Sequence, residues 1–417
     1  MRFDAEQRFT CQQCARCCRR GWDIVLTPDE LAGYRRARAQ RWYREREDAA
    51  EGTQVEPFDP LPGRPEYGRI RKRADGTCGF LSPENRCRIH EELGAARKPL
   101  TCRVFPYRFD PADAPAILSA SFACPTVVRN EGETLASQLT AITTLQREWD
   151  KAYPEPEAPL QFVKGRPLPS GALGTLREVL REMLDRPGPD GALDLAVNVA
   201  RMATLLEDLT RHRVLRLKPY RFVEYLELTG RFAARSEKAA LRRPASLVSR
   251  LLFRGFFFVV AAGRVQLEHG RTWDTRLRLA ALALHCHGLW RATQGYDLAA
   301  ARRVRVDSSD PAVRNVAHNY LRAQVETLGR GRVPVVDELA LAFAFLNAAC
   351  LLAGMRAGQA GRSVDGNAFV DGMLEASDLT HSDPRGALGF LLTTLSGGVD
   401  ALRLFCDAQG AGVAADR

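Results

Sequence analysis

The stretch CQQCARCC at residues 11–18 places four thiols within eight residues, and the interpretation of the whole chain starts from it. Four more cysteines follow before residue 125, at Cys78, Cys87, Cys102 and Cys124. The rest of the 417-residue chain holds only three, at positions 286, 350 and 406. This asymmetry predicts a small module built around cysteines, followed by a larger conventional body.

Clustered thiols of this kind are typical of metal sites. Thiolate is a soft ligand that suits zinc, copper(I) and the iron of iron–sulfur clusters. Two thiols two residues apart can bind one ion or cluster, because a tight turn points both side chains inward. We therefore interpret the whole set as candidate metal ligands: Cys11, Cys14, Cys17, Cys18, Cys78, Cys87, Cys102 and Cys124. They suffice for two four-ligand sites or for one cluster with spare cysteines, and their spacing does not decide between these.

Several neighbours of the cysteines bear on the site. Cys17 and Cys18 are adjacent, and adjacent side chains on an extended backbone point apart. The pair therefore either serves two metals or has one member that is not a direct ligand. His90 is a further candidate ligand, with a polar residue in a helical turn as the alternative. Arg103 is expected to offset thiolate charge, and Phe105 to shield the metal from water.

The predicted compartment agrees with metal binding. The N-terminus has neither the apolar segment nor the cleavage site of a secretory signal, so a cytoplasmic location is expected. The nearest candidate for a membrane span, residues 247–262, is interrupted by Arg250 and Arg254. We interpret it as a buried helix and expect no membrane partner. In a reducing cytoplasm, clustered cysteines favour metal binding over disulfides.

The net charge of +10 is a mild arginine-based excess. It is compatible with an acidic partner, but it is not by itself the footprint of a nucleic-acid-binding protein, and no nucleic-acid partner is predicted. The densest basic stretch is RHRVLRLKPYR at residues 211–221. It is interpreted either as a solvated helix end with its loop or as a contact with an anion or a partner.

The pattern along the chain predicts three parts: a cysteine-cluster module at residues 1–130, a helix and Pro-rich linker at 131–169, and an α-helical domain at 170–417. In the module, Thr27 is expected to cap a helix that runs to about Asp48. Residues 49–68 hold four prolines and are expected to form a loop. Turns are predicted at Asp75-Gly76 and at Glu84-Asn85, and a helical turn at 88–93.

Apolar residues at helical spacing predict the helices of the body. The expected ranges are 173–184, 193–209, 222–232, 247–261, 272–292, 311–328, 336–355, 366–375 and 383–405. No segment alternates with the period of a strand. The predicted fold class is mainly α, with a small irregular α+β cysteine-rich metal-binding N-terminal module on an all-α helical body.

The series Cys11-x2-Cys14-x2-Cys17-Cys18, Cys78-x8-Cys87 and Lys98-Pro99-x2-Cys102-Arg103-x-Phe105-Pro106 resembles the YkgJ-type cysteine-cluster family of zinc- or iron-chelating proteins. Trp22 and the stretch SASFACP at residues 119–125 resemble its flagellin lysine-N-methylase branch. That resemblance implies an iron–sulfur cluster such as 4Fe-4S, with zinc as the alternative. It also implies methyl transfer from S-adenosylmethionine to lysines of a protein substrate such as flagellin.

The residues outside the cysteine series identify no catalytic site. We find no strand, Gly-rich turn and helix of the kind that usually binds S-adenosylmethionine. The cluster His285-Cys286-His287 is expected on a helix, where consecutive residues diverge by about 100° and cannot all face one metal. Cys350 and Cys406 are expected in the core. A non-catalytic metal-chelating or redox module with a helical partner-binding body therefore stands as the alternative to a methyltransferase.

Overall fold

The computed structural model describes residues 1–20, 22–37, 56–110, 117–154, 159–188, 191–235, 310–329, 333–359, 364–381 and 402. The predicted helices at 247–261 and 272–292, most of the one at 383–405, and the cluster His285-Cys286-His287 lie outside these ranges, as does Cys406.

The chain forms two compact units that alternate along the sequence. We call the first the cysteine unit, which consists of Ala5–Phe109 and Ser119–Pro156. The second is the helical unit, which consists of Met1–Asp4, Asp110–Leu118 and Glu157–Arg417. All eight N-terminal cysteines belong to the cysteine unit.

The first helix of the cysteine unit, α1 (Pro28–Arg36), begins as its sequence predicts. The Thr27 hydroxyl accepts a hydrogen bond from the Glu30 amide, and the Glu30 carboxylate accepts one from the Thr27 amide. This reciprocal capping box satisfies two amides that have no partner within the helix. The described helix ends at Arg36, and residues 38–48 of the predicted one lie outside the described ranges.

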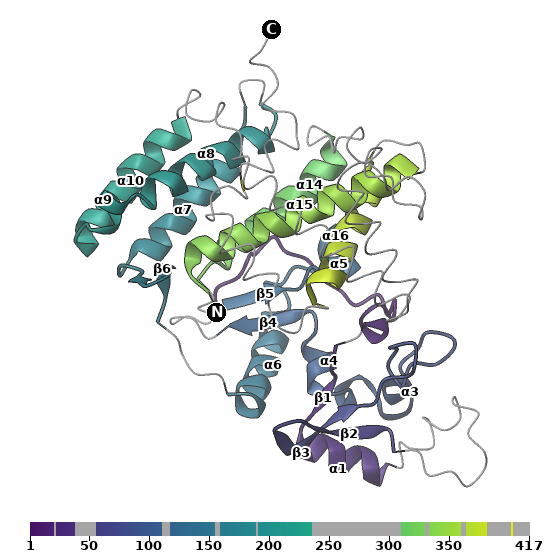
Figure 1. The fold of residues 1–417 in the computed structure, drawn as a ribbon. Coiled ribbons are helices and arrows are strands. Elements are labelled where there is room, and N and C mark those ends of the chain that lie inside the picture. The colour runs from purple at the N-terminus through teal and green to yellow at the C-terminus, as the bar shows by residue number, and fades with distance from the viewer. Residues whose placement is uncertain are drawn as a thin grey trace, which may run out of the picture. The chain divides into compact units, whose positions relative to one another are not determined.

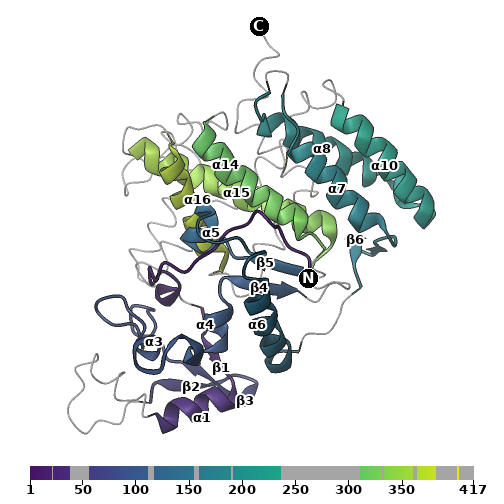
Figure 2. The ribbon, with the colours of Figure 1, turned by 180° about the vertical axis from the view of Figure 1, so that it is seen from behind.

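A three-stranded antiparallel sheet packs beside α1, as Figures 1 and 2 show. Its strands are β1 (Val25–Leu26), β2 (Phe58–Leu61) and β3 (Arg64–Ile70), in the order β1-β3-β2. The prediction of a loop over residues 49–68 is therefore wrong for most of the residues in this range that the structure describes. Pro60 lies on the edge strand β2, and Pro65 is the second residue of β3, outside the stretch that pairs with β1. Both are positions at which a sheet tolerates proline.

The two predicted turns and the helical turn after them are confirmed. The Gly76 amide donates to the Arg73 carbonyl at 2.9 Å, and the Asn85 amide donates to the Ser82 carbonyl at 3.0 Å. The remaining elements of this part of the chain are η1 (Cys17–Arg19), α3 (Arg88–Leu93), η2 (Ala95–Arg97), α4 (Leu100–Val104), β4 (Tyr107–Asp110), β5 (Ile117–Ala120), α5 (Pro125–Arg129) and α6 (Leu139–Ala152), with β4 and β5 paired.

The last segment of the helical unit, Glu157–Arg417, begins with a hairpin that the sequence does not indicate. The strands β6 (Gln161–Val163) and β7 (Arg166–Pro167) pair within the stretch expected to be a linker. Phe162 is fully buried, and its ring meets that of Phe222 edge-on at 5.3 Å. The hairpin is therefore part of the core of the helical unit.

The predicted helices are confirmed wherever the structure describes them. They are α7 (Ala172–Leu184), α8 (Leu195–Leu209), α10 (Pro219–Arg235), α14 (Pro311–Glu326), α15 (Val335–Gln359) and α16 (Gly366–His381). The short helix α9 (His212–Leu215) lies in the basic stretch and is not among the predicted helices. Figure 2 shows α7, α8 and α10 side by side. Together with the small sheets, these helices make the described fold mainly α with some β.

Among the residues that the structure describes, one helix is long and apolar enough to cross a membrane by length and composition, the segment Val335–Gly354 of α15. Residues 247–262 lie outside the described ranges. Within the structure, 82% of that segment is buried. Such burial is typical of a core helix in a folded domain.

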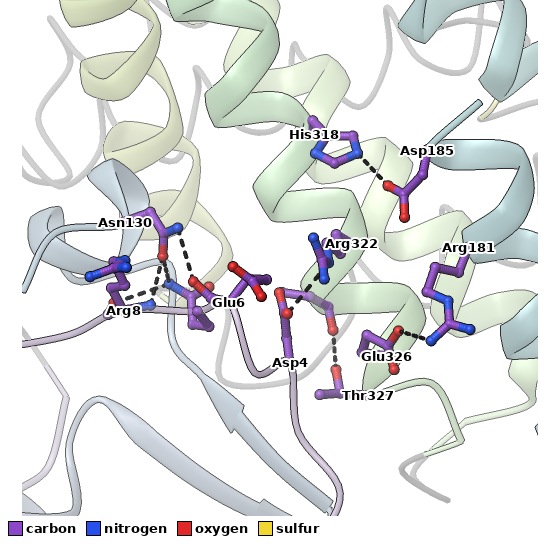
Figure 3. A network of polar contacts seen from close by, with 12 residues as sticks. Asp4, Glu6, Arg8, Asn130, Arg181, Asp185, His318, Arg322, Glu326 and Thr327 are labelled. Atoms are coloured by element: carbon purple, nitrogen blue, oxygen red, sulfur yellow. Dashed lines mark hydrogen bonds and ion pairs between the residues drawn. The ribbon is translucent and has the colours of Figure 1, made fainter. Parts of the chain in front are cut away.

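A polar network fastens the first residues of the chain within the helical unit (Figure 3). Arg2 donates to the Glu326 carbonyl at 3.0 Å and to its carboxylate at 3.2 Å. Arg181 approaches the other oxygen of that carboxylate at 3.5 Å, and Asp4 pairs with Arg322 at 3.5 Å. Nearby, the hydrogen bond from His318 holds the pKa of Asp185 below its usual range.

Because the Glu326 side chain is largely buried, Glu326→Ala is expected to destabilise α14 by about 1–3 kcal/mol. This loss is smaller than that for breaking a fully buried ion pair, because both arginines stay partly exposed. Native-state hydrogen exchange of the α14 amides measures this. Glu182→Ala, at an exposed position of α7, is the control and should change little. Equal effects of the two variants would contradict the role given to Glu326.

Candidate metal centre

Four of the eight candidate thiols meet at the apolar core of the cysteine unit. Cys78 is buried within this core, and Cys18, Cys87 and Cys102 pack against it half-buried. The other core members are Ala15, Ile24, Leu26, Tyr34, Phe58, Ile70, Phe80, Leu81 and Ile89. A group of thiols enclosed by apolar side chains is shielded from water, which strengthens any charge interaction made there.

The backbone of the 11–18 stretch turns sharply between its cysteines. Gln13 and Ala15 have φ angles of +52° and +56°, one in each gap between the first three cysteines. Residues other than glycine rarely adopt this left-handed conformation. The Cys18 carbonyl then accepts from the Cys78 amide at 2.7 Å, which ties the stretch to the second pair of cysteines.

Cys17 and Cys18 do not point apart, contrary to the expectation from an extended backbone. They lie on the 3-10 turn η1, and their Sγ atoms are 4.0 Å apart. Two thiolates bound to one tetrahedral ion at about 2.3 Å lie roughly 3.8 Å from each other. The helical turn therefore leaves the adjacent pair able to face a single ion.

The thiols also act on one another electrostatically. A hydrogen bond from Cys18 lowers the pKa of Cys17, and the same bond raises the pKa of Cys18, as do burial and the charges on Cys78 and Cys102. Burial also raises the pKa of Cys102, followed by the charge on Cys78. Several thiolates in one apolar place repel each other and favour a cation near them.

Two of the cysteines stand immediately before short helices. Cys87 precedes α3, and Cys124 precedes α5. Burial raises the pKa of each thiol, and hydrogen bonds from backbone amides of the following turn oppose that rise: those of His90 and Ile89 act on Cys87, and those of Val127 and Thr126 on Cys124. These amides suit a sulfur that carries negative charge.

Lys98 lies among the thiols, whereas the charge of Arg103 is taken up elsewhere. Burial alone would lower the pKa of Lys98, but the charges of Cys102, Cys87 and Cys11 outweigh it and raise the pKa. Arg103 instead donates to the Lys98 carbonyl at 3.2 Å and pairs with Glu148 at 2.7 Å. The expectation for Arg103 is wrong, because a carboxylate on α6, which the local sequence does not indicate, takes up its charge.

The structure does not bring all eight cysteines to one point. Cys11 and Cys14 are exposed. Charge on Cys14 raises the pKa of Cys124, whereas Cys11 acts on Lys98 and Tyr107. Across the described ranges, no three His, Cys, Asp or Glu side chains are close enough to hold one ion. The ligand roles of the eight cysteines and of His90 therefore remain predictions.

Glu30 connects the start of α1 to the helix that carries Cys102. One of its carboxylate oxygens completes the capping box, and the other accepts from the Leu100 amide at 2.6 Å. Leu100 is the first residue of α4, so this carboxylate supplies an acceptor that the helix itself cannot offer. The hydroxyl of Thr101 adds a hydrogen bond to the Val25 carbonyl at 3.1 Å.

Glu30→Ala is expected to destabilise the cysteine unit by about 1–3 kcal/mol, because it removes acceptors from the starts of two helices. Amide exchange at Leu100 and at the first turn of α1 measures the loss. The control is Asp29→Ala, which alters the same helical turn at an exposed carboxylate. Protection at Leu100 that survives Glu30→Ala would contradict this account.

Comparison with known proteins supports a metal-binding role for this unit. The sequence model of a family with the signature CxxCxxCC, described as a "putative zinc- or iron-chelating domain", matches residues 10–125. The matched segment contains all eight candidate cysteines. Neither the curated proteins nor the solved structures contain a match to the chain.

Proposed function

We propose that the protein is a metalloprotein whose cysteine unit holds an iron–sulfur cluster. The observation that carries the proposal is the convergence of Cys18, Cys78, Cys87 and Cys102 on one apolar core, with Cys17 beside Cys18. These thiols would hold the metal, and Lys98 would offset part of the negative charge of a thiolate-bound centre. The match to a zinc- or iron-chelating domain supports metal binding. The preference for iron over zinc rests on the resemblance to the flagellin methylase branch.

The colour and metal content of the protein distinguish these centres. Purified without oxygen, it is expected to be brown, with broad visible absorption and with iron and acid-labile sulfide in stoichiometric amounts. A colourless protein with stoichiometric zinc would reject the iron–sulfur centre and indicate a structural zinc site. A protein with neither metal would reject both. The proposal places the protein in the cytoplasm, where thiols stay reduced.

We further propose that the bound cluster serves methyl transfer from S-adenosylmethionine to lysines of a protein such as flagellin. The residues behind this step are those that resemble the methylase branch, Trp22 and Cys124-Pro125. Trp22 packs on Phe105 with ring centroids 5.1 Å apart, and the Arg20 guanidinium lies 5.7 Å from its ring. In this proposal, an open iron position would bind the amino and carboxylate groups of the methyl donor.

The test mixes the oxygen-free protein with S-adenosylmethionine and flagellin, and mass spectrometry searches flagellin for methylated lysines. Methylation that needs both the donor and an intact cluster is the expected result. If the cluster is intact and no lysine gains a methyl group, the protein is a non-catalytic chelating or redox module with a helical partner-binding body. Metal analysis of the same sample tests the iron–sulfur cluster independently of the methyl transfer, so the failure of one proposal can be distinguished from the failure of the other.

A further inference from the structure

Helix α10 has one face that packs and one that does not. Its buried residues, Phe222, Leu226 and Ala233, face α7 and α8. Gly230 lies so close to α7 that a Cβ atom there would come within 2.5 Å of Val179. These contacts fix the orientation of the helix. The opposite side therefore faces away from the two helices on which α10 rests (Figure 2).

That opposite side concentrates exposed apolar surface. Leu228 and Phe232, one helical turn apart, are 72% and 71% exposed, and Tyr220 is 56% exposed. With Leu217 in the preceding turn, they are all the large hydrophobic side chains that stand exposed in the described ranges. Single exposed apolar residues need no explanation, but a group confined to one helix and its approach marks an interaction surface.

The same stretch is basic. Residues 211–232 contain six Lys and Arg against two Glu, a net charge of +4. Arg211 and Arg213 lie near Asp208, at 3.1 and 3.9 Å, and Arg221 lies over the Tyr220 ring at 5.7 Å. Within the part of the chain that the structure describes, Arg216, Lys218 and Arg231 have no carboxylate partner. Aromatic side chains and arginine are the residues most enriched where proteins bind each other.

The position of Glu224 separates a protein partner from a membrane. It lies one turn after Tyr220 and one turn before Leu228, so it shares the exposed side with the apolar residues. An anionic lipid surface that reached Leu228 would also press lipid charge against this carboxylate. A folded partner can place an amide or a basic side chain at that one point while its carboxylates meet the arginines.

We propose that the exposed side of α10, with the turn before it, docks an acidic amphipathic helix of a partner protein. The apolar face of that helix covers Leu228, Phe232 and Tyr220, and its carboxylates meet Arg216, Lys218 and Arg221. This inference concerns the helical unit and does not depend on the identity or the chemistry of the bound metal. It gives the basic stretch at residues 211–221 a role in contact with a partner.

The test measures binding of two labelled synthetic helices to the full-length protein by fluorescence anisotropy. Both peptides carry leucines along one face; one has glutamates on the other face and the second has lysines there. The glutamate peptide is expected to bind at least about tenfold more tightly, and added salt should reduce the difference. Leu228→Ser with Phe232→Ser, and separately Arg216→Glu, should each weaken its binding about tenfold. Arg129→Glu, an exposed position in α5, is the control.

Four results would overturn the proposal. The first is equal binding of the two peptides. The second is that the α10 variants bind the glutamate peptide as tightly as the unchanged protein does. The third is that vesicles containing phosphatidylglycerol bind the protein through Leu228 and Phe232 while the glutamate peptide does not bind, which would identify a membrane surface. The fourth is that Leu228→Ser with Phe232→Ser lowers the melting temperature or changes the oligomeric state. In that case another part of the chain, or a second copy of it, already covers this face.

Discussion

Cys102→Ser and Cys78→Ser, made singly, are each expected to weaken metal binding by more than about 100-fold. Replacing a group that merely orients a ligand typically costs 10- to 100-fold, and removing a ligand costs more. Serine keeps the size of the side chain but offers a poorly ionised hydroxyl in place of a soft thiolate. Both thiols lie at the core of the cysteine unit, where solvent cannot easily replace them. Metal analysis after purification without oxygen measures the loss.

The matched control for these substitutions is Cys350→Ser. Cys350 is as deeply buried as Cys78, but it lies on α15 in the helical unit. The same chemical change there should leave the metal content intact, whatever it does to the stability of that unit. Loss of metal from Cys350→Ser, or full metal content in Cys102→Ser, would contradict the assignment of the centre to the cysteine unit.

Phe80→Ala is expected to destabilise the metal-free cysteine unit by about 3–5 kcal/mol, the usual cost of emptying a buried phenylalanine site. Phe80 is 1% exposed, packs on Phe58 with ring centroids 5.8 Å apart, and its carbonyl accepts from the Arg88 amide at 2.9 Å. Phe80 lies between Cys78 and Cys87 in the sequence, so the cavity left by the substitution would remove part of the apolar packing that supports these thiols. Denaturant unfolding of chelator-treated protein measures the cost.

The bound metal should mask part of this loss, because a ligand that binds the folded state alone adds to its stability. Phe80→Ala is therefore expected to release metal to a chelator faster than the unchanged protein, with Phe80→Leu between the two. Leucine fills more of the cavity and serves as the graded control. If alanine and leucine were equally well tolerated, Phe80 would not support the thiols as described.

What the sequence predicts well is local. The Thr27 cap, the turn at Gly76 and the helical turn at 88–93 depend on residues a few positions apart, and the structure has all three. The helices of the body follow from apolar spacing in the same way. The cysteine series identifies the candidate site because thiols are scarce elsewhere in the chain.

What the sequence does not predict depends on distant partners. The strands β2 and β3 are not predicted because both contain proline, which argues against a strand when only the sequence is considered. An edge strand and the first residues of a strand nevertheless tolerate proline. Arg103 pairs with Glu148, 45 residues later, whereas Lys98 lies among the thiols. Arg2 joins the helical unit through Glu326, 324 residues away. No local pattern contains such pairs.

Anomalous X-ray scattering from crystals grown without oxygen shows whether the thiols of the cysteine unit hold a metal. Data at the iron and zinc edges identify the element, count the sites and assign each thiol at once. We expect iron peaks bonded to Cys18, Cys78, Cys87 and Cys102. A zinc peak bonded to the same thiols would keep the chelating site and reject the iron–sulfur centre. Metal-free thiols, or a metal bonded only outside residues 11–124, would contradict the account.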